Sequence, residues 1–186
     1  MRQANEDLAE IREQIWVLRA QRGDAAAFRQ LVDAYERKLL YFVRRFVRDA
    51  TLALDVMQDV WLAVFRRLAG LREPRAFRVW LYQIAHDQVV RFIRRERRQA
   101  EVHADYSDMQ SAESIDELAA IDNAELVHRA LELLSPEHRE VLTLRFLEDM
   151  SIEEIAETVR CSLGTVKSRL HYAKRAMRQR VEESVP

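Results

Sequence analysis

The sequence predicts an all-α protein, built as two small helical domains joined by an acidic linker, with a helix-turn-helix domain at the C-terminal end. The 186 residues contain only 3 Gly and 3 Pro, too few turn formers for a sandwich or a barrel. Ala, Leu, Glu, Arg and Gln are abundant, and all five favour helices. An apolar fraction of 48% is ample for a packed core, and the length allows one domain or two small ones.

Charge is arranged in blocks that the net charge of −1 conceals. Residues 91–98 carry five Arg and one Glu, and residues 160–180 carry seven basic residues and no acid. Between them, residues 101–125 carry eight acids and no Lys or Arg, with little helical periodicity. We therefore expect an N-terminal helical extension over residues 1–23, a first domain over 24–99, a linker over 100–122 and a second domain over 123–186.

Composition also excludes several classes of protein. The single cysteine, Cys161, cannot form an intramolecular disulfide or a Cys-based zinc site, and it favours a reducing, cytoplasmic location. The charged N-terminus lacks the apolar core of a secretory signal, and no run of 18 apolar residues predicts a membrane span. The five His lack metal-binding spacing, and no phosphate-binding loop or nucleophile motif is present. We expect no metal, no cofactor, no catalytic residue and no membrane insertion.

The first domain is predicted to begin with two helices. Asp24 is a suitable N-cap for a helix over residues 25–49, and Thr51 for a second helix that ends at Gly70. One face of the second helix is apolar at helical spacing and is expected to be core: Leu52, Val56, Met57, Val60, Trp61, Val64, Phe65 and Leu68. The opposite face places Leu62 among Asp55 and Asp59. It is either a docking face or an ordinary exposed leucine.

A third helix is predicted from Pro74 to residue 99, since proline suits the first helical turn. Its buried stripe consists of Phe77, Leu81, Ile84, Ala85 and Phe92. An adjoining surface carries Trp80, Gln83, Asp87, Val90, Arg91 and Arg94. An aromatic ring beside cations is what binding to unstacked bases requires, because the ring stacks and arginine binds phosphate. The alternative is that Trp80 is a half-buried residue at the helix seam.

The second domain carries the clearest local signals. Ser135-Pro136 starts a helix that continues to residue 149, and Ser151 with Glu154 forms a capping box that opens a short helix. After a turn over residues 159–162, a longer basic helix begins near Leu163. Its inner stripe is Leu163, Val166, Leu170, Ala173, Met177 and Val181. A short helix, a tight turn and a longer helix together predict a helix-turn-helix.

The outward face of this last helix is polar and basic. It carries Ser168, His171, Tyr172 and Arg175, flanked by Lys167 and Arg178. Such side chains reach base edges and phosphates when a helix lies in the major groove of DNA. The competing interpretation is a basic helix whose outer face is only solvated.

Three segments, two in the first domain and one in the second, together resemble a known family. DVMQDVWLAVFRRL at residues 55–68 and FRVWLYQIAHDQVVRFIRRERR at 77–98 are similar to region two of the extracytoplasmic-function (ECF) group of bacterial RNA polymerase sigma factors. LSPEHREVLTLRFLEDMSIEEIAETVRCSLGTVKSRLHYAKRAMR at 134–178 is similar to region four. The resemblance covers roughly residues 24–182, in the family's order. It implies a sigma factor that binds core RNA polymerase and promoter DNA, assists promoter melting and is not an enzyme.

The resemblance also implies which residues form each binding surface. Contacts to core polymerase are expected from Asp55, Gln58, Asp59 and Leu62. The −10 element and the melted strand are expected to contact Trp80, Gln83, Asp87, Arg91, Arg94, Arg95, Arg97 and Arg98. The −35 element is expected to contact Arg160, Thr165, Lys167, Ser168, Arg169, His171, Tyr172 and Arg175. An anti-sigma inhibitor, common in the family, is an expected partner.

The chain departs from the family pattern at four of these positions. Asp87 and Arg91 stand where the family usually has Asn and Asp, which changes hydrogen-bond polarity at the −10 pocket. Arg160 replaces the usual Gly of the turn, where a left-handed conformation costs roughly 1 kcal/mol more than with Gly. Tyr172 stands where Arg is frequent. The departures at Asp87 and Arg91 favour a second class of function: a sigma-like adaptor, or a helix-turn-helix regulator, that binds a partner without initiating transcription.

Overall fold

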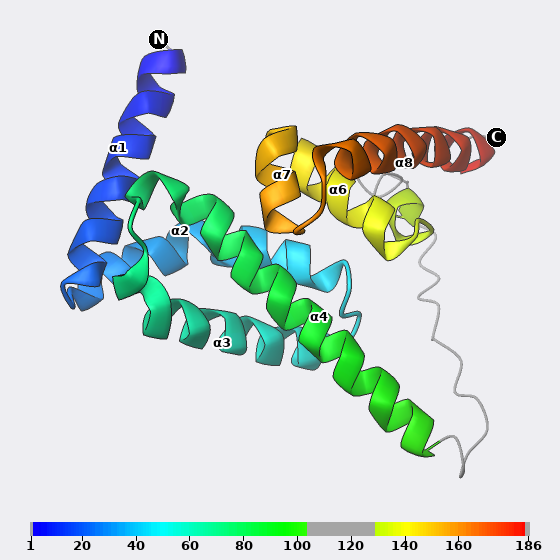
Figure 1. Cartoon of the computed structure of the whole chain (residues 1–186), viewed down its shortest axis with the longest axis horizontal. Helices are drawn as coiled ribbons and strands as arrows, with labels where there is room; N and C mark the ends of the chain where they lie inside the picture. Colours follow the sequence, from blue (N-terminus) through cyan, green and yellow to red (C-terminus); the bar gives the residue numbers. More distant parts are fainter. Residues whose placement is uncertain (1, 104–128, 185–186) are drawn as a thin grey trace.

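The computed structural model describes residues 2–103 and 129–184, and all regular structure within them is helical, as predicted. The first domain contains α1 (Arg2–Gln21), α2 (Ala25–Arg44), α3 (Ala50–Arg67), the 3-10 turns η1 (Leu68–Gly70) and η2 (Pro74–Ala76), and α4 (Phe77–His103) (Figure 1). The second domain contains α6 (Pro136–Phe146), α7 (Ile152–Thr158) and α8 (Leu163–Ser184). Most of the predicted linker lies outside the described residues.

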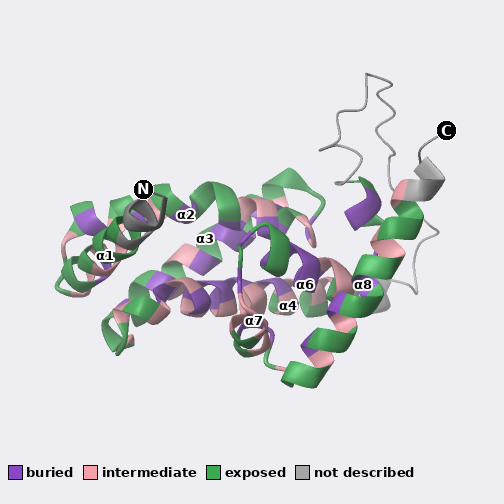
Figure 2. Cartoon of the chain, turned by 90° about the horizontal axis from the view of Figure 1, so that it is seen from above, coloured by how far each residue is buried: buried purple, intermediate pink, exposed green. Residues whose placement is uncertain are grey.

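The core of the first domain lies between α2, α3 and α4, whose buried faces point inward (Figure 2). Aromatic rings meet edge to face there: Phe42 and Tyr82 with centroids 5.5 Å apart, and Tyr35 and Phe77 with centroids 5.7 Å apart. Such pairs add to the hydrophobic stabilisation that burial itself provides. The apolar stripes predicted on α3 and α4 form part of this core, and Leu31, Tyr35, Leu39, Phe42 and Val43 of α2 complete it.

Helix α1 packs on the first domain. Val17 is fully buried, and the Glu13 carboxylate accepts a hydrogen bond of 2.5 Å from the Tyr35 hydroxyl. The Gln21 amide donates to the carbonyls of Leu68 and Leu71 at 3.0 and 2.6 Å, which ties the end of α1 to η1. The opposite face of α1 is apolar and exposed, with Leu8, Ile11, Ile15 and Leu18 between 46% and 64% accessible.

Two predicted helix boundaries in the first domain are wrong. Helix α2 ends at Arg44 instead of residue 49, because the chain turns there to bury Val47. The N-cap of α3 is Asp49 rather than Thr51, and its carboxylate accepts from the backbone N–H of Leu52 at 2.9 Å. Asp is among the residues most favoured at the N-cap, so α3 begins after Asp49 rather than after Thr51.

Two residues predicted to be core are exposed, and one helix is longer than expected. Phe65 is 68% accessible because it lies at the edge of α3, where only the Phe28 ring packs against it, at 5.4 Å. Leu163 is 44% accessible because it begins α8, ahead of the buried Val166. Helix α4 continues to His103, past the predicted start of the linker at residue 100.

The helix-turn-helix is present with the predicted caps. The Ser151 hydroxyl accepts from the N–H of Glu154 at 3.0 Å, and the Glu154 carboxylate accepts from the N–H of Ser151 at 2.7 Å. The turn that follows contains Arg160 at φ 52°, a left-handed conformation that favours glycine. The Ser162 hydroxyl accepts from the N–H of Thr165 at 3.1 Å and so starts α8.

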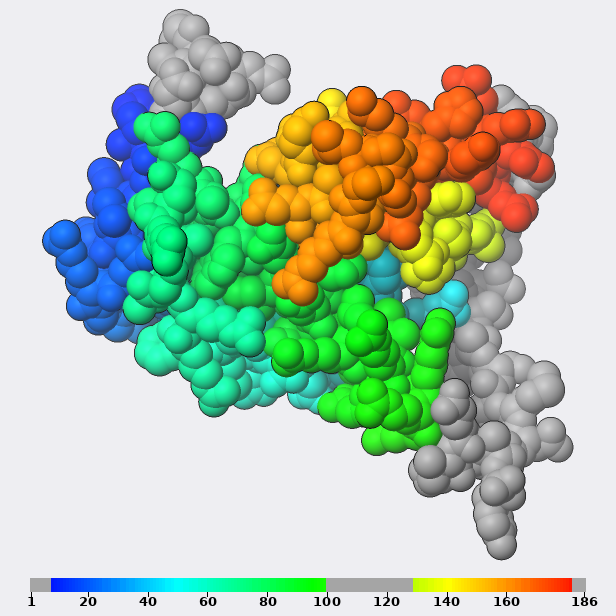
Figure 3. Space-filling view, in the orientation of Figure 1, coloured from blue at the N-terminus to red at the C-terminus, as the bar shows by residue number. Residues whose placement is uncertain are grey.

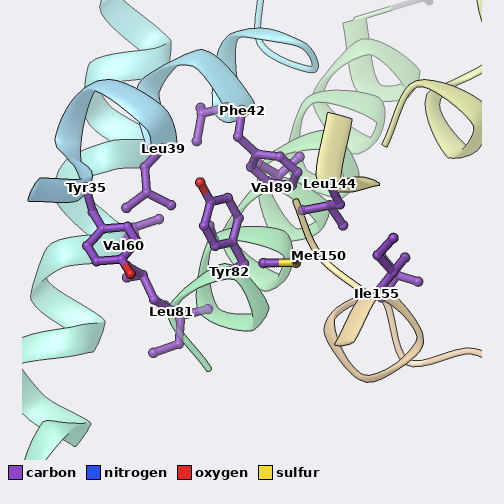
Figure 4. Packing of buried hydrophobic residues seen from close by; sticks show 14 of the residues in the cluster. Tyr35, Leu39, Phe42, Val60, Leu81, Tyr82, Val89, Leu144, Met150 and Ile155 are labelled. Atoms are coloured by element: carbon purple, nitrogen blue, oxygen red, sulfur yellow. The ribbon is translucent and has the colours of Figure 1, made fainter. Parts of the chain in front are cut away.

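The two domains pack directly against each other. Tyr82 and Val89 of α4 lie close to Leu144, Met150 and Ile155 of the second domain, all within one buried cluster (Figure 4). In the space-filling view, α7 and the turn after it lie against α4 (Figure 3). Helix α4 therefore contributes to the cores of both domains.

The capping box generates a test of the second domain. Ser151→Ala removes the acceptor for the N–H of Glu154, and we expect it to lower the free energy of unfolding by about 1 kcal/mol, the usual cost of losing such a cap. Ser151→Thr keeps the hydroxyl and should cost far less. Urea denaturation followed by circular dichroism measures both. Equal stability of the two variants would show that the hydroxyl does not act as a cap.

Candidate nucleic-acid interface

The predicted −35 surface is an exposed face of α8. Lys167, Ser168, His171, Tyr172 and Arg175 are all exposed, and the His171 and Tyr172 rings lie 5.4 Å apart, edge to face. Two further predicted residues, Thr165 and Arg169, are half-buried. The structure thus places five candidate side chains together on one helix, directed away from the domain core.

The predicted polymerase-docking surface lies on α3. Asp55, Gln58, Asp59 and Leu62 are all exposed, and Leu62 is 43% accessible. A pocket of about 280 Å³ separates this surface from α4. It is lined by Asp55, Val56, Asp59, Gln88, Arg91, Phe92 and Arg95. Acids of the docking surface and cations of the −10 surface therefore face the same pocket.

The predicted −10 surface of α4 differs between its two ends. Arg91, Arg94, Arg95, Arg97 and Arg98, in the second half of the helix, are exposed. In the first half, Trp80, Gln83 and Asp87 are half-buried. Trp80 packs near Phe77, with centroids 6.1 Å apart, so it has the seam position that the alternative interpretation expected.

The first half of this surface is half-buried because α7 and the following turn bond to it. The Gln83 amide donates to the carbonyl and the carboxylate of Glu157, at 3.3 and 3.2 Å. The Asp87 carboxylate accepts from the Arg160 guanidinium at 2.8 Å. Two residues predicted for the −10 element thus have partners in the second domain.

Further contacts between the domains involve residues that sequence reasoning did not single out. Arg78 donates to the Glu154 carboxylate at 2.7 Å and to the carbonyl of Glu148 at 3.0 Å. The Nδ1 atom of His86 lies 2.6 Å from the Glu140 carboxylate. Arg139 of α6 donates to the carbonyl of Arg45. No local pattern predicts these pairs, because the partners lie 54 or more residues apart.

Cations from the predicted −10 and −35 surfaces line a second pocket. Its volume is about 320 Å³, and it lies between α4 and the second domain. Arg94 and Arg97 line it from α4 and Arg169 from α8, together with the acids Glu137 and Glu140 of α6. The pocket therefore combines charges of both signs.

Glu148 and Glu154, at the domain contact, have shifted pKa values. Burial raises the pKa of the Glu148 carboxyl above its usual value. Burial also acts to raise the pKa of Glu154, but the hydrogen bond from the Ser151 N–H and the bond from Arg78 outweigh it, and the pKa is lowered. Glu154 is therefore held as an anion, and Arg78 is its cation.

Neither a metal centre nor a membrane span is found within residues 2–103 and 129–184. No group of three or more His, Cys, Asp or Glu residues is arranged there to hold a metal ion. No helix of this part of the chain is both long and apolar enough to cross a membrane.

Comparisons with known families match both domains. Residues 31–99 match the family described as Sigma-70 region 2, and residues 124–177 match Sigma-70, region 4. The chain is 35% identical over 181 residues to the RNA polymerase sigma-H factor of Pseudomonas aeruginosa, covering 91% of this chain and 94% of that protein. It is 33% identical over 184 residues to the ECF RNA polymerase sigma-E factor of Escherichia coli K12, covering 93% and 96%.

Solved structures share the fold. CnrH, solved in complex with the cytosolic domain of CnrY, superposes with a TM-score of 0.68 at 25% identity, over 94% of this chain and 99% of that chain. The sigma factor RpoE from Bartonella quintana, solved in complex with the anti-sigma factor NepR, superposes with a TM-score of 0.69 at 21% identity, over 83% and 96%.

The buried carboxyl at the domain contact generates a prediction about pH. Because the pKa of Glu148 is raised in the folded state, its ionisation costs stability at neutral pH, and this cost disappears as the pH falls through the raised pKa toward the ordinary value. We expect Glu148→Gln to raise the free energy of unfolding at pH 7 and to give no gain below about pH 4. Urea denaturation at the two pH values measures this. The exposed Glu36→Gln is the control, and a gain from Glu148→Gln that is equal at both pH values would contradict the assignment.

Proposed function

Because this chain belongs to the extracytoplasmic-function group of bacterial RNA polymerase sigma factors, we propose that three of its surfaces divide the work of finding and opening a promoter. The protein is a transcription initiation factor and not an enzyme: core RNA polymerase supplies the catalysis, and this subunit supplies promoter choice and strand opening. In our proposal α3 docks on the polymerase, α4 binds the −10 element and α8 reads the −35 element, all in the cytoplasm.

The outer face of α8 carries the proposal. A helix that follows a capped helix and a tight turn is the one that enters the major groove in a helix-turn-helix. Here that helix presents Lys167, Ser168, His171 and Tyr172 toward the bases and Arg175 toward the phosphates, all exposed. Tyr172 stands where the family frequently has Arg. It loses a charge contact to DNA and gains packing on a thymine methyl or a sugar.

The second half of α4 supports binding of the separated strand. Five exposed arginines follow one another within residues 91–98 and form a path for phosphates. Trp80 supplies an aromatic ring near the start of the same helix. Since Asp87 and Arg91 alter the polarity of the base pocket, we expect a −10 sequence that differs from that of relatives.

An inhibitor protein is a further proposed partner. Two structures that share this fold contain a second protein, the cytosolic domain of CnrY in one and the anti-sigma factor NepR in the other. The second domain of this chain has an apolar groove of about 490 Å³ between α6 and α8, with Phe146 and Met177 in its lining and Lys174 and Arg178 at its edge. Such a groove suits an amphipathic helix that carries acidic residues.

One observation favours the second candidate function, an adaptor that does not initiate transcription: Gln83 and Asp87 are bonded to the second domain rather than free for DNA. Run-off transcription with purified core polymerase and a promoter library separates the two functions. Transcripts that depend on the chain and start downstream of a common −35 and −10 pair support the sigma factor. Binding to an inhibitor without any such transcript supports the adaptor.

The reading helix generates a prediction about promoter strength. Lys167→Ala and Arg175→Ala each remove a cation from the outer face of α8, so both should weaken transcription from a promoter whose −35 element is intact. Loss of a phosphate contact should also lower the salt slope of binding by about one unit. Transcription from the same promoter with a scrambled −35 element is the control. Variants that transcribe like the parent at moderate salt would show that α8 is not the reading helix.

The docking surface generates a separate prediction. Leu62→Asp places a charge in the apolar contact, so we expect loss of binding to core polymerase with unchanged helical circular dichroism. Leu18→Asp is the matched control, because Leu18 has a similar accessibility, 46% against 43%, but lies on α1. Co-purification with core polymerase is the measurement. If Leu62→Asp still co-purifies, the docking surface lies elsewhere.

A further inference from the structure

Two of the positions where this chain departs from the family pattern are bonded to each other. Asp87 stands in place of an asparagine on α4, and Arg160 in place of a glycine in the turn of the helix-turn-helix. The Arg160 guanidinium lies 2.8 Å from the Asp87 carboxylate, although the residues are 73 positions apart. An amide opposite a glycine cannot form an ion pair, so the contact depends on both departures.

The backbone conformation at Arg160 also indicates that its side chain serves the contact with Asp87. Its φ of 52° is a conformation in which a side chain is strained and glycine is not. Nothing in the local turn requires a cation at this position, because the turn is closed by the Cys161 N–H, which donates to the carbonyl of Ala156 at 3.1 Å. The Arg160 guanidinium instead binds Asp87, on the other domain.

The pair is one of three contacts that hold α7 and its turn along the first half of α4. Arg78 binds Glu154 near the start of α7, and Gln83 binds Glu157 one turn further on. The third contact is the ion pair between Asp87 and Arg160, just after the end of α7. Two of these three groups on α4, Gln83 and Asp87, belong to the predicted −10 surface, so DNA cannot bind them while α7 is in place.

The apolar contacts between the domains and the ion pair between Asp87 and Arg160 differ in strength. Tyr82, Met150 and Ile155 are buried between the domains and supply most of the attraction (Figure 4). The Arg160 side chain is 64% accessible and that of Asp87 is 28%, and a pair so exposed changes an equilibrium constant by about fivefold at most. The ion pair therefore adjusts a closed arrangement that apolar packing creates.

We propose that the free chain closes on itself, with α7 and the turn after it covering the first half of the −10 surface of α4, and that Asp87 and Arg160 form a latch that biases it toward this closed state. The inference rests on the proposed function, since it concerns the regulation of the same −10 surface. Promoter DNA and the latch compete for Asp87. Arg160 acts through Asp87 in the closed chain, rather than only as a contact to the −35 backbone.

Charge reversal tests the latch without DNA or polymerase. Spin labels at the exposed positions Glu36 on α2 and Lys174 on α8, in a chain whose Cys161 is replaced by Ser, report the distance between the domains by double electron–electron resonance. Arg160→Glu and Asp87→Lys should each raise the ratio of open to closed chains about fivefold or more, because attraction becomes repulsion. The double variant, Arg160→Glu with Asp87→Lys, places opposite charges together again and should restore the distance distribution of the parent chain. All three retain a side chain at residue 160, so backbone strain is constant. Unchanged single variants, or a double variant that stays open, would overturn the latch.

Arg160→Gly gives a second, independent readout. Glycine relieves the strained turn, so the variant should fold at least as well as the parent, yet its open fraction should rise by up to about fivefold. The distance distribution is the readout, because Arg160 is also an expected contact to the −35 element and a change in transcript yield would mix the two roles. An open fraction equal to that of the parent chain would overturn the latch.

The two proposals fail in different ways. The distance measurement requires no transcription, so an absent latch leaves the sigma factor assignment standing. Conversely, a parent chain that shows the predicted distances but gives no transcript from any promoter would overturn the proposed function and leave the latch intact.

Discussion

The packing of α4 against both domains is the constraint on which the rest of the structure depends. Phe77 and Leu81 of this helix are fully buried in the first domain, while Tyr82 lies near Met150 and Val89 near Leu144 of the second (Figure 4). One helix therefore contributes to two cores and carries the predicted −10 surface. These roles conflict, because Gln83 and Asp87 bind the second domain and are also the residues predicted to bind the melted strand.

The distribution of charge over the surface also depends on this packing of the two domains. The formal charge of −1 argues against a nucleic-acid binder when taken as a sum. In the folded chain several acids are bonded internally: Asp87 to Arg160, Glu154 to Arg78 and Glu140 to His86. The exposed cations of α8 and of residues 91–98 are concentrated on two faces. The two surfaces proposed to bind DNA are thus more basic than the whole protein.

Local features of the fold were accessible to sequence reasoning, and features set by competition or distance were not. The capping box at Ser151 and the exposed face of α8 follow from rules that span three or four residues, whereas the left-handed conformation at Arg160 was expected from the family resemblance. The cap of α3 was misassigned because two candidates two residues apart competed, and Asp49 prevailed. Phe65 was misassigned because helical spacing identifies an apolar stripe but not where the neighbouring helices end.

By itself the sequence determined the helices, the helix-turn-helix, the family resemblance and the side chains on each candidate binding surface. Only the tertiary structure decided that α1 packs through Val17 and leaves its other apolar face exposed, and that α7 covers the first half of the −10 surface. The physical reason is the separation along the sequence over which each effect acts. Propensity, capping and periodicity act within a few turns of helix, whereas Arg78 and Glu154 meet across 76 residues, where no local pattern encodes a partner.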